Sequence, residues 1–239
     1  MATIKTHLQN VAELVGVTKP ASFVGNTEAT ARRLLRSASA AGRYLRNRDW
    51  RALTFEHTFA TVDGTLSYAL PTSPAFHHFI AATAYDRSSY RGIVGPLNPR
   101  AWQSGEALLV VSGGMEHRFR IKSDTSTPRT NLFYLLDDPD GAFTLAYEYV
   151  THEWSYDGSS SYSENITADS NQPVFDDYLF EVECTWRALK ALGEPYFDEK
   201  DEAMRLADNL YGQENGTTIS MRSNPILFAE NIPETGIGL

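Results

Sequence analysis

Apolar residues recur at intervals of three and four positions at the start of the chain, which is the spacing of one face of an amphipathic helix. They are Ile4, Leu8, Val11, Ala12 and Val15. Gly16 and Pro20 follow this stretch, and both residue types commonly end helices. The pattern predicts a short helix over residues 4–15.

A second helical pattern extends from about residue 26 to residue 48, with Asn26 or Thr27 as its predicted cap. Its apolar stripe consists of Ala31, Leu34, Leu35, Ala38, Gly42 and Leu45. Four arginines fall within a band of about 80° beside that stripe. They are Arg32, Arg36, Arg43 and Arg46. We predict that they contact a neighbouring subunit, and contact with DNA or plain solvation are the alternatives.

Between residues 54 and 150 apolar and polar residues alternate, as is typical of strands. A hairpin is predicted around a turn at Asp63-Gly64, with apolar positions at Phe55, His57, Phe59, Leu66, Tyr68 and Leu70. Further strands are expected at residues 118–122, 131–135 and 143–150. Asn98 followed by Pro99 predicts a short helix that includes Trp102. The middle of the chain therefore forms an antiparallel sheet or a small sandwich.

The stretch from Ser155 to Asn165 is rich in serine and predicts an exposed, mobile loop. Asp176 or Asp177 then caps a third long helix, which Gly193 ends. A fourth helix begins near Phe197 and is expected to stop at Gly212. The last segment has two prolines and no helical period, yet it is apolar, so we expect it to order on a partner. Its predicted contact residues are Ile226, Leu227, Phe228 and Ile232.

The predicted fold class is α+β, because the outer helix pairs can bury their stripes only against one another. A four-helix bundle would be formed by N-terminal helices in residues 1–53 and C-terminal helices in residues 175–213. An antiparallel β domain is inserted at residues 54–174, and an extended tail occupies residues 214–239.

Composition narrows the function further. The 239 residues carry a net charge of −9, which argues against tight binding to nucleic acid and leaves only passing contact with DNA. A single cysteine, Cys184, excludes an intrachain disulfide and a multi-cysteine zinc site and suits assembly in a reducing cytoplasm. No apolar run reaches the length of a membrane span, so we expect neither a signal peptide nor a membrane segment.

Candidate chemistry is sparse. His77 and His78 form an adjacent pair that would point in different directions on an extended strand, without a third ligand at zinc-like spacing. Asp137, Asp138 and Asp140 lack the register of a calcium loop. We predict no catalytic residue, no metal and no cofactor. Two alternatives stay open: a hydrolase that uses His57, His77 or His152 with an aspartate, and a β-sandwich module of a virion that binds a receptor or carbohydrate through Trp154, Tyr156 and Tyr162.

Five stretches in this order resemble the head-to-tail adaptor, or connector, proteins of short-tailed bacteriophages, related to the tubular tail protein A class. They are VAELVG at residues 11–16, RDWRAL at 48–53, GPL at 95–97 before Trp102, AYEYV at 146–150 before Trp154, and TWRALK at 185–190 before Gly193. The resemblance covers most of residues 1–213.

The resemblance implies a structural virion protein rather than an enzyme. It would form a dodecameric ring with copies of itself, between the portal protein and the tail nozzle protein, and line the channel through which the genome leaves. The C-terminal segment would reach the portal. Assembly would take place in the host cytoplasm, with no membrane involved.

Overall fold

The computed structural model describes residues 2–109, 117–126, 129–139 and 141–214. Its helices are α1 (Ile4–Leu14), α2 (Ala29–Leu45), α3 (Pro99–Leu109), α4 (Asp177–Leu192) and α5 (Phe197–Glu214), with a 3₁₀ turn at Arg51–Leu53. The strands are β1 (Thr54–Ala60), β2 (Ser67–Ala69), β3 (Phe76–Phe79), β4 (Tyr85–Asp86), β5 (Arg91–Gly92), β6 (Phe119–Ser123), β7 (Asn131–Leu135), β8 (Thr144–Thr151), β9 (Ser155–Tyr156), β10 (Tyr162–Ser163) and β11 (Gln172–Pro173). The described chain is thus α+β, with antiparallel sheets.

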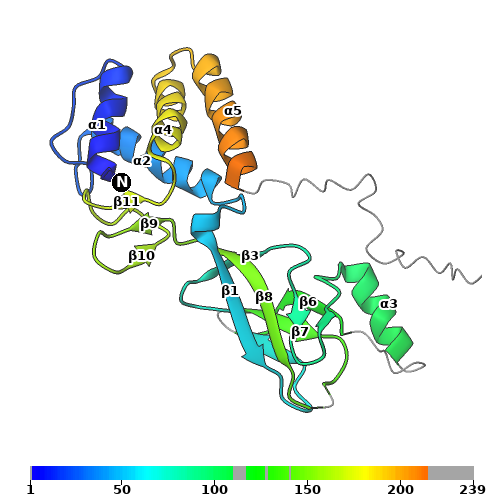
Figure 1. Cartoon of the computed structure of the whole chain (residues 1–239). Coiled ribbons are helices and arrows are strands. Elements are labelled where there is room, and N and C mark those ends of the chain that lie inside the picture. The colour runs from blue at the N-terminus through cyan, green and yellow to red at the C-terminus, as the bar shows by residue number, and fades with distance from the viewer. Residues whose placement is uncertain (1, 110–116, 127–128, 140, 215–239) are drawn as a thin grey trace, which may run out of the picture.

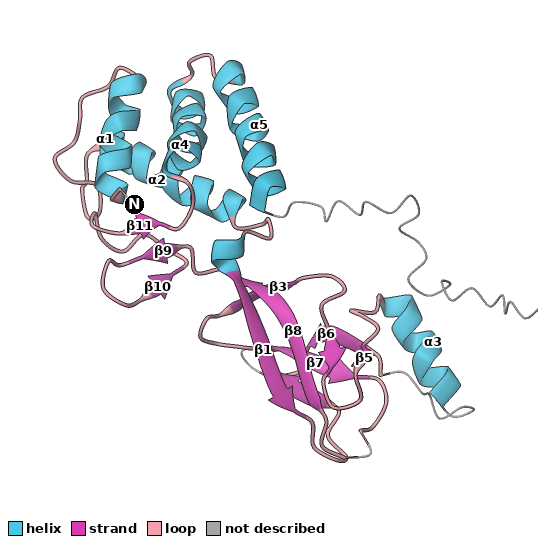
Figure 2. Cartoon of the chain, viewed as in Figure 1, coloured by secondary structure: helices cyan, strands magenta, loops and turns pink. Residues whose placement is uncertain are grey.

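Two parts are visible in Figure 1 and Figure 2. The helical part comprises residues 2–53 and 154–214, and it includes the short strands β9, β10 and β11 beside the helices. The β part comprises the described residues from 54 to 153, with α3 at its far side. The chain passes between the two parts twice, into β1 and out of β8.

The helix ends follow local chemistry, as predicted for α1, α3 and α4. The Asp176 side chain accepts a hydrogen bond from the Leu179 N–H at 2.9 Å and caps α4, and Gly193 ends this helix in the left-handed conformation, with φ 83°. The predicted second helix was too long. Asn26 accepts from the Glu28 N–H in a turn ahead of α2, which therefore begins at Ala29, and α2 ends at Leu45. In contrast, α5 continues past Gly212 to Glu214.

α4 contacts α1, α2 and α5, so residues far apart in sequence share one core. The α2 backbone comes very close to Trp154, which is fully buried. A Cβ added to Gly42 would lie 2.4 Å from the Trp154 ring, so only glycine fits there. His7, buried on α1, joins α4 through its Nδ1, which lies 2.9 Å from Glu181 Oε1.

The β part contains two sheets that do not follow the predicted hairpin. β1 pairs antiparallel with β8, from Thr54 opposite Val150 to Ala60 opposite Thr144, and β3 and β4 also pair with β8. β2 instead pairs with β7, which pairs with β6. The turn at Gly64 forms, with φ 74°, but it carries the chain from one sheet to the other. The hairpin prediction was therefore wrong, whereas strands at β6, β7 and β8 are confirmed.

Stacked aromatic rings join the two sheets of the β part. Phe133 lies between Phe119 of its own sheet and Tyr147 of β8, with ring centroids 4.5 Å and 5.5 Å away and nearly parallel planes. Phe59 meets Phe133 edge-on at 5.5 Å. The two-residue period of a strand places Tyr147 of β8 and Phe133 of β7 on the faces that meet in this cluster. Ala146 and Val150, on the other face of β8, are buried as well.

The stretch predicted as an exposed loop is a small hairpin within the helical part. β9 pairs with both β10 and β11, and Ser155 is buried. The Asp157 carboxylate accepts hydrogen bonds from the N–H groups of Ser159, Ser160 and Ser161. These bonds lower the pKa of Asp157 to about 2, and they organise a turn that its composition did not reveal.

Candidate functional site

A cluster of polar side chains lies where the helical part meets the β part. His78 Nε2 is 2.8 Å from Asp49 Oδ1, and the ring of His77 lies 6.4 Å from that of His152. Arg46 donates to the His152 carbonyl at 3.3 Å. The cluster, which we call the junction cluster, therefore links the end of α2 to β3 and the end of β8.

The histidine pair does not behave as predicted. His77 Nδ1 and His78 Nδ1 lie 2.7 Å apart, although neighbours on a regular strand point to opposite faces. The reason is a shift in the pairing of β3 with β8 between Phe76 and His78, which breaks the alternation. Burial, helped by the nearby His78, Arg46 and His152, lowers the pKa of His77 to about 4, so this ring is neutral at neutral pH.

The hydrolase alternative required these histidines to meet a catalytic partner. His57 lies elsewhere, on β1, and packs on Phe59 and Tyr147 with ring centroids 5.6 Å and 5.4 Å away. Burial lowers its pKa. His152 Nε2 lies 3.4 Å from Glu164 Oε2. The structure thus brings His77 and His152 together at the junction and leaves His57 in the aromatic core.

In the parts of the chain that the structure describes, no group of three histidine, cysteine, aspartate or glutamate side chains could hold a metal ion. Of the aspartates considered for calcium, Asp138 accepts from the Gly64 N–H, and Asp137 lies 4.0 Å from the Arg118 Nε. Asp140 lies outside the described residues. Cys184 is fully buried, and this burial raises its pKa well above the usual value.

The arginine band on α2 is divided by the fold. Arg43 donates to Asn165 Oδ1 at 3.0 Å, and Arg46 lies 3.8 Å from Glu164, so the C-terminal half of the band contacts the loop after β10 in the same chain. Arg32 and Arg36 are exposed, and neither forms an ion pair with another described residue. The N-terminal half of the band is therefore the part that forms no ion pair with a described residue, and Arg43 is exposed as well.

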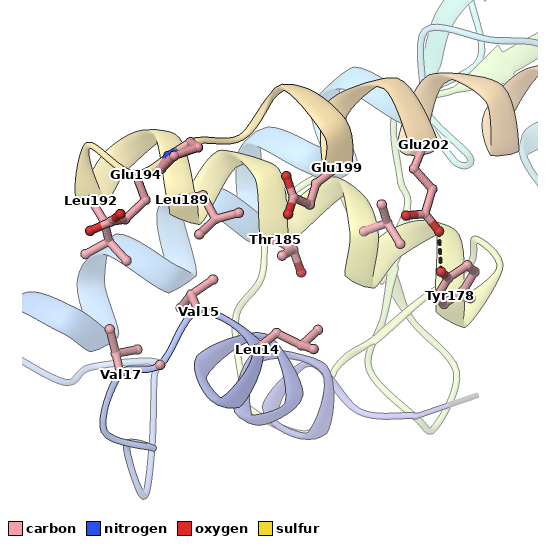
Figure 3. Close-up of a pocket in the computed structure, with 13 residues that line it drawn as sticks. Leu14, Val15, Val17, Tyr178, Thr185, Leu189, Leu192, Glu194, Glu199 and Glu202 are labelled. Carbon is pink, nitrogen blue, oxygen red and sulfur yellow. Dashed lines mark hydrogen bonds between the residues drawn. The ribbon is translucent and has the colours of Figure 1, made fainter.

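A groove of about 810 Å³ opens between the end of α1, the length of α4 and the start of α5 (Figure 3). Its apolar lining consists of Leu14, Val15, Val17, Val182, Leu189, Leu192 and Pro195. Three carboxylates stand around it, from Glu194, Glu199 and Glu202, and no basic side chain is among the described residues that line it. Leu14, at the edge of this apolar lining, is 69% exposed.

The sequence did not point to this groove. Its residues come from three segments, and none of these has a sequence motif typical of a binding site. The acidic residues in the first turn of α5 were noticeable, but they were interpreted as favourable charges at a helix N-terminus. Tyr178, half exposed, donates a hydrogen bond to Glu202, which raises the pKa of Tyr178. The tail residues Ile226, Leu227, Phe228 and Ile232 lie outside the described residues.

The alternative of an exposed aromatic binding site required Trp154 to be accessible. Trp154 is fully buried and stacks near Phe175 in the core of the helical part, with ring centroids 6.2 Å apart. Tyr156 and Tyr162 do pair, at 4.8 Å, and Tyr162 is 51% exposed. The prediction that Trp154 belongs to an exposed loop was wrong, because the chain turns back to the helices immediately after β8.

Comparison with known proteins shows which family the chain belongs to. None of the described helices is long and apolar enough to cross a membrane. No curated protein matches the chain. Residues 2–225 match the family described as SU10 adaptor protein, which is nearly the whole chain. The chain therefore belongs to the SU10 adaptor protein family and is a bacteriophage adaptor, a structural protein of the virion.

Proposed function

We propose that this chain joins the portal to the tail of a short-tailed phage, as one subunit of a dodecameric adaptor ring between the portal protein and the tail nozzle protein. The match to the adaptor family over residues 2–225 is the observation that carries the proposal. The ring would surround the channel through which the genome leaves. We further propose that the chain has no catalytic role.

The charge of the chain supports a channel function. A net charge of −9 repels DNA phosphates, so that genomic DNA would pass with only transient, non-specific contact. The exposed arginines Arg32 and Arg36 would then serve contacts between subunits. In the same proposal, the apolar residues Ile226, Leu227, Phe228 and Ile232 bind the portal.

The test is direct. Purified full-length chain is mixed with purified portal rings, and complexes are imaged by electron microscopy. We expect a ring of twelve copies on one end of each portal. A well-folded chain that leaves the portal bare at saturating concentration contradicts the proposal.

The contribution of the tail is tested in the same assay. Replacing Ile226, Leu227 and Phe228 with serine should weaken portal binding on the order of 100-fold, because buried apolar anchors dominate such contacts. Replacing Thr217 and Thr218 with alanine in the same segment is the matched control and should leave binding unchanged. Equal binding by both variants removes the tail from the interface.

A further inference from the structure

The outer face of α2 carries positive charge that the described chain does not neutralise. Arg32, Arg33 and Arg36 are all exposed, and none forms an ion pair with another described residue. The opposite face of α2 is buried against α1 and α4 through Ala31, Leu34, Ala38, Ala41 and Leu45. The arginines therefore point away from both helices and from the rest of the core.

The groove has the complementary chemistry. Its floor is apolar, its rim holds Glu194, Glu199 and Glu202, and no described basic side chain lines it. Arginine has an apolar stem and a charged head. Three arginines on one helix face can therefore cover Leu14 and Val17 with their stems while their guanidinium groups reach the glutamates.

The two surfaces cannot meet within one chain. The groove is built by α1, α4 and α5, and Figure 3 shows α2 passing behind α4, on the side away from the groove. The charges on the two surfaces differ in sign, so each repels its own copy and attracts the other. A contact between unlike surfaces repeats from subunit to subunit, which is the arrangement that closes into rings.

We propose that the groove binds the Arg32, Arg33 and Arg36 face of α2 from a second copy of this chain, head to tail. The inference rests on the proposed ring and names its subunit interface. The tail is a poorer occupant, because residues 215–239 contain Glu230 and Glu234 but only one basic residue, Arg222. DNA fits the arginines but not the acidic groove.

Charge reversal in two separate variants tests the pairing. One variant carries Arg32→Glu and Arg36→Glu, and the other carries Glu194→Arg and Glu199→Arg; Glu202 is kept because it accepts from Tyr178. Self-association of the full chain is measured by sedimentation over a concentration series. Each variant alone should associate at least about 100-fold more weakly than the unaltered chain, since like charges face each other.

An equal mixture of the two variants should recover association, because every contact then joins opposite charges. The matched control is Arg100→Glu with Arg129→Glu, which reverses two exposed arginines of the β part and should change nothing. Circular dichroism confirms that each variant is folded. An unaltered chain that stays monomeric, variants that associate normally, or a mixture that stays dissociated overturns the inference. Loss of DNA retention with intact association would assign the arginines to DNA instead.

The outcome is separable from that of the proposed function. If the reversed variants form the same rings on portal particles as the unaltered chain, the interface is wrong while the adaptor role stands. If the chain never binds portals but the mixture recovers association, the interface is right and the portal-binding role fails.

Discussion

The helical part and the β part achieve dense packing with different side chains. Around α2 the core is made of small residues that let backbones approach large rings, and Gly42 against Trp154 is the tightest example. In the β part, large rings fill the space between two sheets, with Phe133 at the centre of the stack. The helical part is therefore most sensitive to added volume, and the β part to removed volume.

The largest expected effect comes from removing the central ring of the β part. Phe133→Ala deletes contacts with Phe119, Phe59 and Tyr147 and leaves a cavity at a fully buried position. We expect a loss of about 4 kcal/mol in the free energy of unfolding, measured with urea. Phe133→Leu, which retains most of the volume, should cost about 1.5 kcal/mol or less. A nearly neutral Phe133→Leu would mean that the ring stack adds nothing beyond bulk, whereas equal losses in both variants would contradict the expected cavity effect and assign the loss to the aromatic contacts.

Tryptophan fluorescence shows whether the helical part unfolds together with the β part when Phe133 is replaced. Three of the four tryptophans, Trp50, Trp154 and Trp186, lie in the helical part, and Trp102 lies on α3. If the two parts unfold separately, Phe133→Ala should change the circular dichroism of the β part at urea concentrations where this fluorescence is still native. A single common transition would show that the parts unfold together.

Adding one methyl group to the helical part should have the next largest effect. In Gly42→Ala the new Cβ would lie 2.4 Å from the Trp154 ring, which is held among Phe175 and Phe180 and cannot move aside. We expect a loss of about 3 kcal/mol. The matched control is Gly212→Ala on α5, where nothing lies within 4 Å and the better helix propensity of alanine should stabilise by about 0.5–1 kcal/mol. A neutral Gly42→Ala would contradict the close approach.

A substitution at the N-cap of α4 tests how much one capping hydrogen bond contributes to the stability of the helical part. Asp176→Ala removes the acceptor for the Leu179 N–H and should cost about 1 kcal/mol. Asp176→Asn keeps an acceptor oxygen and should cost only a few tenths of this amount. Thermal unfolding of both variants, followed at the helical signal, decides between them. If Asn is as destabilising as Ala, charge rather than the hydrogen bond matters at this cap.

Local determinants also explain what could be predicted from sequence. α1, α4 and α5 have caps, periodic stripes or end residues within a few positions of each other, and the predicted segments match them closely. For α3, the pair Asn98-Pro99 predicted where the helix begins but not where it ends. The order of helices, β elements and helices followed from the same signals. The resemblance of five short stretches then led to the adaptor family before any pairing of strands was known.

Long-range pairing and assembled surfaces were not predictable in this way. β1 is joined to β8 across more than eighty residues, from Ala60 opposite Thr144, and nothing near β1 specifies that partner. The turn at Gly64 looked like a hairpin because a turn motif does not reveal which sheet each flanking strand joins. The groove combines Leu14, Leu189 and Glu199 from three helices, so only the packed structure brings them together.

The smallest effect is expected at the junction cluster between the two parts, and it depends on pH. The folded protein holds the pKa of His77 at about 4, whereas an unfolded histidine titrates near its ordinary value of about 6.5. Between these values the unfolded chain binds the extra proton, so stability is complete above about pH 6.5, falls as the pH is lowered toward 4, and then levels off. His77→Gln should reduce this fall, as measured by urea midpoints at pH 7 and pH 5. The reduction should be modest, because water reaches the ring and screens its neighbours Arg46, His78, His152 and Glu164. An unchanged slope in the variant would show that His77 protonation does not weaken the contact between the helical and β parts.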